Sequence, residues 1–266
     1  MSVTTSSRPV GELLRAWRER RRLSQLELAL QAEVSTRHLS FVETGRSSPS
    51  RDMILHLADQ LEVPLRQRNQ LLLAAGYAPV YSQTTLDAPQ LSTVRAAVRE
   101  ILTAHEPNPA VVVDRHWNVV DANSGLSAFT ECIEAPELLA PPVNVMRLSL
   151  HPRGAAPHIV NLRQWRAHLL GRLRREIAQT ADDGLAELYA EVRAYQSELG
   201  AEIPDSPGPD EVVMRLRFQA HDQELAFFTT VVAFGTPLDI TIAELAIELF
   251  FPADASTADA LRRRRA

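Results

Sequence analysis

The sequence contains no lysine, one cysteine and few aromatic residues, and each shortage narrows what the chain can be. All 28 basic residues are arginines, and aromatic residues make up 6% of the 266 positions. The single Cys132 excludes an internal disulfide framework. No apolar run reaches the roughly eighteen residues of a membrane span, and the N-terminus (MSVTTSSRPV) lacks the apolar core of a signal peptide. We therefore expect a soluble cytoplasmic protein with no membrane partner.

Charge is distributed unevenly along the chain. Residues 1–79 hold 11 Arg and 8 acidic residues, a net charge of +3, whereas residues 80–266 carry a net charge of −8. A basic module followed by an acidic domain is typical of a nucleic-acid-binding unit joined to something else. An excess of +3 also lies within ordinary scatter, so the charge supports such a unit without establishing it.

Helical patterns fill the N-terminal part of the chain. Ser24, Ser35 and Ser50 each precede an apolar periodic segment and can accept a hydrogen bond from an unpaired helical N–H group. Pro64 suits the first turn of a further helix, and an amphipathic helix comes before all of these. We expect an all-α bundle of five helices over residues 8–76.

The most informative stretch lies within this bundle, at residues 24–49. Two short helical patterns are separated by a turn, and the second opens with the polar residues Thr36, Arg37 and His38. A helix pair with a polar leading end on its second helix is how a helix-turn-helix presents side chains to the DNA major groove. The segment therefore predicts double-stranded DNA as a partner.

The rest of the chain mixes helical and extended patterns. Residues 77–90, rich in Pro, Ser and Thr, read as a linker to a domain over residues 91–258, and residues 259–266 read as an Arg-rich solvated tail. The domain is expected to contain helices at 91–104, 124–131, 143–149, 159–180, 183–199 and 241–251, two strands within 109–123, a loop at 202–210 and a hairpin of 212–219 with 224–235. Strands and helices without βαβ alternation indicate an α+β domain.

The N-terminal residues resemble the XRE (Cro/C1-type) helix-turn-helix family. The resemblance rests on Leu23-Ser24-Gln25, Leu28-Ala29, Val34-Ser35, Glu43-x-Gly45-Arg46 and Pro49. The C-terminal part resembles the MmyB-like transcription regulators, on Asn144-Val-Met-Arg147, Leu150-His151-Pro152, Asn161-x-x-x-Trp165, Phe234-Gly235-Thr236-Pro237, Asp239, Glu244-Leu245 and Phe250-Phe251-Pro252-Ala253-Asp254. This second resemblance implies a PAS-like fold around a small apolar ligand, with a fatty acid as the favoured class.

The first resemblance also implies which residues meet DNA. The expected set is Gln25, Ser35, Thr36, Arg37, His38, Ser40, Phe41 and Arg46. Thr36, Arg37 and Ser40 are expected to read bases, and the Arg37 guanidinium can bind guanine bidentately. Phe41 can contact a thymine methyl group or pack on the protein.

Other residues of the set are expected to meet the DNA backbone. Gln25 at a helix start and Arg46 in a loop suit phosphate contacts, and His38 is expected nearer phosphate than bases. The resemblance pairs Arg18 with Glu43 as a partly buried ion pair that joins two helices. The run Arg20–Arg22 is a solvated face or a further phosphate contact.

Ligand contacts are expected in the C-terminal domain. Polar candidates to orient a head group are Asn123, Arg147, His151, Asn161 and Arg166, and apolar candidates are Trp165 and Phe228. A fatty-acid carboxylate favours an arginine, because the planar guanidinium matches it bidentately. Arg147 lies in the most family-like segment, although it could equally brace the fold.

Metal binding and catalysis find little support in the sequence. His151 and His158 have no zinc-like spacing, and one cysteine cannot supply a thiolate pair. The acidic neighbours of Cys132 disfavour a reactive thiolate, and no hydrolase elbow, HExxH or phosphate loop is present. We expect no metal, no cofactor beyond a possible bound fatty acid, and no enzymatic activity.

These observations favour a ligand-responsive transcription regulator that binds a pseudo-palindromic operator as a homodimer. Two other interpretations stay open. One is a constitutive DNA-binding protein whose PAS-like domain only dimerises, and the other is an enzyme with an accessory helix-turn-helix. A bound apolar molecule in the purified protein would separate the first interpretation from both.

Overall fold

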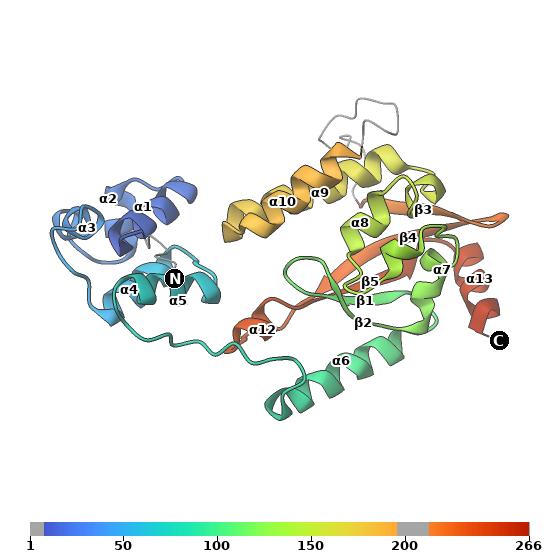
Figure 1. Cartoon of the computed structure of the whole chain (residues 1–266), viewed down its shortest axis with the longest axis horizontal. Helices are drawn as coiled ribbons and strands as arrows, with labels where there is room; N and C mark the ends of the chain where they lie inside the picture. Colours follow the sequence, from blue (N-terminus) through green and yellow to red (C-terminus); the bar gives the residue numbers. More distant parts are fainter. Residues whose placement is uncertain (1–7, 196–212, 266) are drawn as a thin grey trace, which may run out of the picture. The chain divides into compact units, whose positions relative to one another are not determined.

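Figure 1 shows the computed structural model of the chain, in which residues 8–195 and 213–265 are described. The chain divides into two compact units, one formed mainly by residues up to Gln83 and the other mainly by residues from Thr84 onward. The first unit is helical, and the second combines helices with a sheet. An all-α unit followed by an α+β domain is the predicted fold class.

Residues 8–83 contain the five expected helices. They are α1 (Val10–Arg20), α2 (Gln25–Gln31), α3 (Thr36–Glu43), α4 (Arg51–Gln60) and α5 (Leu65–Ala74). Their apolar faces enclose one core that includes Leu14, Leu28, Leu39, Ile54 and Leu72.

The predicted helix starts are confirmed in detail. The hydroxyls of Ser24, Ser35 and Ser50 each accept a hydrogen bond from the backbone N–H three residues later, at 3.1 to 3.2 Å. Ser24 also donates its own N–H to the Glu27 carboxylate at 2.6 Å, which completes a capping box. Pro64 lies one residue before α5 instead of inside its first turn.

A glycine sets the distance between α1 and α3. A Cβ atom on Gly11 would lie 2.2 Å from the carbonyl oxygen of Val42, a separation that real atoms do not reach. The missing side chain therefore lets the backbones of α1 and α3 approach each other directly. Helix α1 therefore packs directly on α3, the helix expected to enter the DNA groove.

The second unit contains the remaining helices and all of the described strands. They are α6 (Ser92–His105), β1 (Ala110–Val113), β2 (Val119–Ala122), α7 (Ser127–Thr130), α8 (Val145–Leu150), α9 (Leu162–Thr180), α10 (Asp183–Ala194), β3 (Arg215–Ala220), β4 (Gln223–Val232), α12 (Ile240–Ala243), β5 (Ala246–Pro252) and α13 (Ala255–Arg265), with short 3-10 turns at Pro89–Leu91, Ser124–Leu126, Pro136–Leu139 and Ala156–His158.

The described strands form one antiparallel sheet in the order β2-β1-β5-β4-β3 (Figure 1). Alternate residues of β1 belong to two hydrophobic cores on opposite faces of the sheet, because successive side chains of a strand point to opposite faces. Val111 and Val113 pack with α9 and α10, whereas Ala110 and Val112 pack with α6. Val111 pairs across the strands with Glu248 of β5, and this pair lies on the face covered by α9.

The predicted helix at 241–251 is wrong. Only Ile240–Ala243 are helical, and Ala246–Pro252 form β5, which pairs with β1 on one side and β4 on the other. A strand covered on both faces has apolar residues at nearly every position, so its sequence lacks the alternation that marks a half-exposed strand. This segment is the centre of the sheet.

The predicted solvated tail at 259–266 is also wrong as far as Arg265. Residues 255–265 form α13, which packs against β4 and β5, and its residues Ala260 and Leu261 are buried in the core. The prediction was based on the run of arginines and gave no weight to the two apolar residues that anchor the helix.

Other sequence expectations are confirmed with small shifts of boundary. The strand pair β1–β2 turns at Arg115 and His116, and the hairpin β3–β4 turns at His221 and Asp222. The predicted loop at 202–210 and parts of the segments 183–199 and 212–219 lie outside the described residues. Among the described residues, no helix is long and apolar enough to cross a membrane.

Candidate functional site

Helix α3 exposes a row of polar side chains at its leading end. The Ser35 cap fixes the start of the helix, Arg37 is exposed, and Thr36, His38 and Ser40 are partly exposed. The opposite side of the helix is buried through Leu39 and Val42. The residues expected to read bases therefore lie on the solvent side of α3.

Phe41 lies between two of the expected DNA-contacting arginines. The Arg37 guanidinium lies 5.3 Å from the Phe41 ring centroid, and that of Arg46 lies 6.0 Å from it. Both distances are within the range of a cation–π contact. The backbone N–H groups of Arg46 and Ser47 also donate to the Phe41 carbonyl at 2.8 and 3.1 Å. Phe41 thus contacts the side chains of both arginines.

A buried network fixes α3 to the helices around it. Arg18 donates to both carboxylate oxygens of Glu43, at 2.7 and 2.9 Å, and both residues are buried. The remaining Arg18 nitrogen donates to the Leu23 carbonyl at 2.7 Å, and Gln25 Nε2 donates to Glu43 at 2.8 Å. The geometry agrees with the structural role expected of Arg18 and Glu43. Since an amide nitrogen carries two hydrogens, Gln25 keeps a second N–H for another acceptor.

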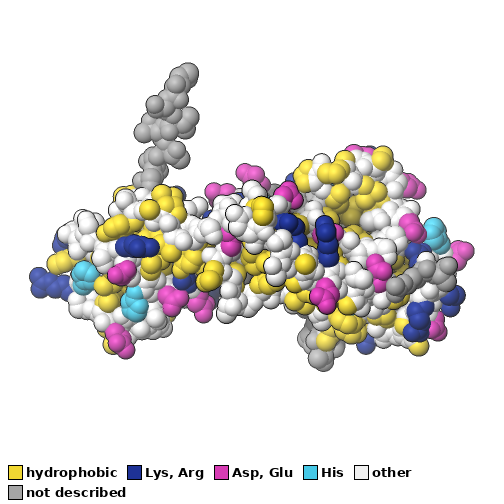
Figure 2. Space-filling model, turned by 90° about the horizontal axis from the view of Figure 1, so that it is seen from below, with side chains coloured by type: hydrophobic (Ala, Val, Ile, Leu, Met, Phe, Trp, Pro, Cys, Tyr) yellow, Lys and Arg dark blue, Asp and Glu magenta, His cyan; other side chains and the backbone are white. Residues whose placement is uncertain are grey.

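Not every arginine of the first unit is available to DNA. Arg21 donates to the carbonyls of Leu61 and Glu62 at 2.8 and 2.9 Å, and so completes the end of α4. On the face shown in Figure 2, acidic and basic side chains are interspersed over both units. On that face, therefore, neither the basic first part of the chain nor the acidic second part presents a surface of uniform charge.

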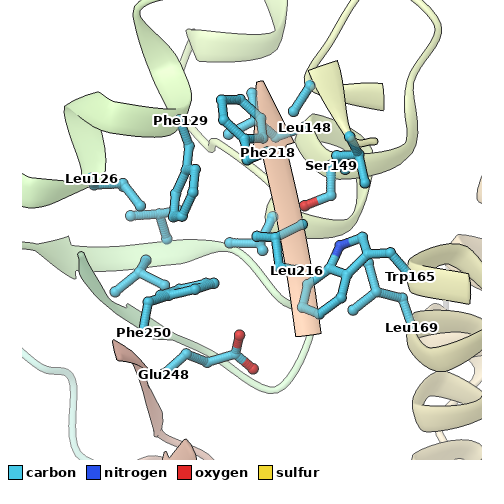
Figure 3. Close-up of a pocket in the computed structure, with 15 residues that line it drawn as sticks. Leu126, Phe129, Leu148, Ser149, Trp165, Leu169, Leu216, Phe218, Glu248 and Phe250 are labelled. Carbon is cyan, nitrogen blue, oxygen red and sulfur yellow. The ribbon is translucent and has the colours of Figure 1, made fainter. Parts of the chain in front are cut away.

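The second unit encloses a cavity between its sheet and the helices α8 and α9 (Figure 3). Its open volume is about 50 Å³. Apolar side chains make up most of the lining, namely Val111, Val119, Leu126, Phe129, Val145, Leu148, Ala155, Ile159, Trp165, Leu169, Leu216, Phe218 and Phe250, joined by the polar residues Ser149 and Glu248.

Glu248 is the one ionisable residue in this lining. It comes from the central strand β5, is 4% exposed, and its carboxylate points into the cavity in Figure 3. Burial raises the pKa of Glu248, and the charge of Arg172 opposes that rise. The Arg172 Nη1 atom donates to Glu248 Oε1.

Arg172 on α9 has further partners. Its Nε donates to Glu176 at 3.2 Å, and its guanidinium lies 4.2 Å from the centroid of the Trp117 ring. The Trp117 indole N–H in turn donates to Glu176 at 2.8 Å. The cavity carboxylate is therefore tied to α9 and to the turn between β1 and β2.

Family models match both parts of the chain. The family model for the MmyB-like transcription regulator ligand binding domain matches residues 94–263, and a helix-turn-helix domain model matches residues 9–71. The first match covers more than half of the chain. The chain belongs to the MmyB-like transcription regulators. The comparison with curated proteins finds no match.

Membership gives each unit of this MmyB-like regulator its general role. The helix-turn-helix match spans all of α3, so the first unit is a DNA-binding domain. The ligand-binding match contains every residue that lines the cavity. The protein is a DNA-binding transcription regulator with a ligand-binding domain.

The structure places one predicted ligand contact of this MmyB-like regulator, Trp165, in the cavity wall. Arg147 lies outside the lining and donates to both carboxylate oxygens of Glu191 on α10, each at 2.7 Å. Hydrogen bonds from Arg147 hold the pKa of Glu191 below its ordinary value. The His151 ring packs edge-on against Tyr195, also outside the lining. Arg147 thus braces α8 against α10.

The other predicted ligand contacts also have positions outside the lining. Asn123 accepts from the Ala110 N–H and donates to two carbonyls, which fixes the edge of β1. Asn161 bonds the backbone of β3 at Arg215 and Arg217. Arg166 is fully buried and donates to the Arg193 carbonyl at 2.7 Å, and the Phe228 ring stacks on Phe251.

Sequence reasoning missed the two polar residues of the cavity, Ser149 and Glu248. A signal was present for the second, since Glu248 is a lone acid within an apolar run. The segment 241–251 was predicted to be a helix, and that prediction gave Glu248 no place in a cavity.

The described residues show no group of three or more His, Cys, Asp or Glu side chains suited to a metal ion. Burial raises the pKa of the Cys132 thiol, and Glu131 adds to that rise. Both effects favour the unreactive protonated thiol.

Proposed function

We propose that this regulator binds a pseudo-palindromic operator as a homodimer, with α3 in the major groove, and that a small apolar molecule in the cavity sets its DNA affinity. In this proposal Thr36, Arg37 and Ser40 read bases, while Gln25, Ser35, His38 and Arg46 lie along the phosphates. Phe41 keeps Arg37 and Arg46 in place. The observation that carries the DNA site is the exposed polar end of α3 above the buried pair Arg18–Glu43.

Dimerisation follows the usual symmetry of helix-turn-helix operators, in which two recognition helices meet successive turns of the groove. The sheet order β2-β1-β5-β4-β3 supports the proposed PAS-like classification of the second unit. We propose no catalytic role and a cytoplasmic location, in keeping with the domains of a transcription regulator.

The size of the cavity bears on the ligand. A cavity of about 150 Å³ holds benzene, and sites for drug-sized ligands span about 300–1,000 Å³. This cavity has about 50 Å³ of open space. A fatty acid, the class suggested by the resemblance, therefore requires lining side chains to move. The small volume favours, as a second candidate function, a constitutive regulator whose second unit only dimerises.

Native mass spectrometry of the full chain separates these two functions. A ligand-responsive regulator retains an apolar molecule, or gains one on exposure to cell extract, and the added mass disappears after organic extraction. A chain that stays unliganded in every extract supports the constitutive function.

The DNA contacts are tested with operators selected from a random duplex pool. Arg37→Ala should cost about 1–3 kcal/mol at one base position and relax the preference there. Gln25→Ala should weaken binding to all sequences alike. Arg15→Ala is the control, because Arg15 is an exposed arginine of α1 paired with Glu19. If Arg37→Ala and Gln25→Ala leave operator affinity at the value of the control, the assignment of α3 is wrong.

A further inference from the structure

The polar groups of the cavity indicate what kind of molecule it accepts. The lining combines thirteen apolar residues with Ser149 and Glu248, and it contains no arginine, lysine or histidine. The chemistry of a ligand that fits this lining is a question that rests on the proposed ligand-binding function.

Glu248 makes the cavity unfavourable to an anion. Its carboxylate is buried on the central strand, and its cationic partner, Arg172, is shared with Glu176 and stacked over Trp117. A ligand carboxylate in the same enclosed space would face Glu248 without a cation in the lining. Two carboxyl groups in one poorly solvated site cannot both ionise at low cost, so an acid enters only with the uptake of a proton.

The cavity lining also contains hydrogen-bond donors. Trp165 is 5% exposed, and neither its indole N–H nor the Ser149 hydroxyl has a hydrogen-bond partner among the described residues. In Figure 3 both groups lie at the cavity, on α9 and α8, with Glu248 on β5. The indole can only donate, the hydroxyl can donate or accept, and an ionised carboxylate can only accept. The cavity therefore offers both a donor and an acceptor to a ligand.

Arg147, the expected partner of a fatty-acid carboxylate, does not change this polarity. It lies outside the lining and its guanidinium is bound on two sides by Glu191. Nothing in the lining replaces it as a cation.

We propose that the cavity selects an uncharged apolar molecule whose polar group donates a hydrogen bond to Glu248 and accepts one from Trp165 or Ser149, in preference to a carboxylate of the same chain length. Alcohols and primary amides have this chemistry. Ionised fatty acids lack the donor and carry the charge that Glu248 opposes.

Three probes of equal chain length test the proposal on the full chain at neutral pH, by isothermal titration calorimetry. They are octanol, octanoate and the methyl ether of octanol. Octanol should bind at least roughly tenfold more tightly than octanoate, because like charges brought together in an interface cost several kcal/mol. The ether should bind more weakly than octanol, because it has no hydrogen to donate. This comparison needs no variant and so does not depend on the folding of one.

Variants then assign the selectivity to one residue. Glu248→Gln keeps an acceptor but removes the charge, and it should reduce the advantage of octanol over octanoate severalfold. Glu191→Gln is the matched control, since it removes a partly exposed carboxylate that bonds Arg147 outside the cavity. It should leave the ratio of the two affinities unchanged.

The outcomes separate this inference from the proposed function. If octanoate binds as tightly as octanol or more so, the inference is overturned while the ligand-binding function stands. If octanoate gains affinity in Glu191→Gln instead of Glu248→Gln, Arg147 is the group that receives the ligand and the inference is again overturned. If none of the probes binds, both the inference and the proposed cavity function fail.

Discussion

Each of the two units buries a glutamate beside an arginine, and the two pairs differ in what surrounds them. In the first unit, Glu43 receives hydrogen bonds from Arg18 on both oxygens and from Gln25. In the second unit, Glu248 receives one from Arg172 and lines the cavity. The first pair is closed within the protein, whereas the second pair borders the cavity in which we propose that a ligand binds.

This difference suggests that similar buried pairs serve two purposes. A fully bonded pair holds helices in one arrangement, as the α1–α3 contact at Gly11 requires. A pair with free acceptor capacity beside an apolar space can recognise a molecule. If the distinction is correct, removing the two glutamates should have unequal effects on stability and on binding.

The largest effect is expected from Glu43→Ala. This change leaves the buried Arg18 guanidinium with its bond to the Leu23 carbonyl and a 3.9 Å contact with the exposed Glu19 carboxylate. It should lower the free energy of unfolding by about 3–5 kcal/mol. Chemical denaturation of the full chain measures the loss in the transition that includes the first unit.

The control for that prediction removes both charges together. The double variant Arg18→Met with Glu43→Leu should recover most of the stability, because no unpaired charge remains buried. A double variant as unstable as Glu43→Ala would show that the pair stabilises the fold by more than mutual neutralisation.

A smaller loss is expected from Glu248→Gln. The amide keeps an acceptor for Arg172, and Arg172 keeps Glu176 and the Trp117 ring, so unfolding should become easier by about 1–2 kcal/mol. The same denaturation experiment measures it. A loss as large as that of Glu43→Ala would remove the distinction between a closed and an open pair.

The smallest effect is expected at Arg147 and Glu191. Hydrogen bonds from Arg147 lower the pKa of Glu191 from 4.5, so the pair stabilises the fold at pH values above about 4.5 and loses this contribution as the pH falls through the lower folded value. Both side chains are more than a third exposed, so solvent reduces the contribution to less than about 1 kcal/mol. Glu191→Gln should flatten the acid limb of stability against pH, and an unchanged limb would contradict this.

The two units also differ in how far their sequences predict them. In the first unit, serine caps, helical periodicity and the family motif each describe local relations, so the helices and the pair Arg18–Glu43 were predicted correctly. In the second unit, β5 pairs with strands far away in the sequence. Its residues gave no alternating pattern and were read as a helix.

The two candidate sites differ in the same way, because one is formed by residues close together in the sequence and the other is not. The α3 residues share one short helix, so once the family resemblance pointed to that helix their common face followed from local spacing. The cavity combines residues of α8, α9, β1, β3 and β5, among others. Only the tertiary fold shows that Ser149 and Glu248 line one cavity while Arg147 is bound elsewhere. A motif identified the family of the domain but not the polarity of its cavity.

The affinity of the full chain for its selected operator, measured with and without saturating octanol, tests the central claim most directly. If the ligand binds the DNA-competent and DNA-incompetent arrangements of the protein with different affinities, it changes the affinity for DNA. By linkage, DNA changes the affinity for the ligand by the same factor. We predict a change of about fivefold or more, abolished when the lining is altered by Glu248→Leu. Equal operator affinity at saturating octanol, in a protein shown to bind octanol in the cavity, would contradict the account of this protein as a ligand-responsive regulator.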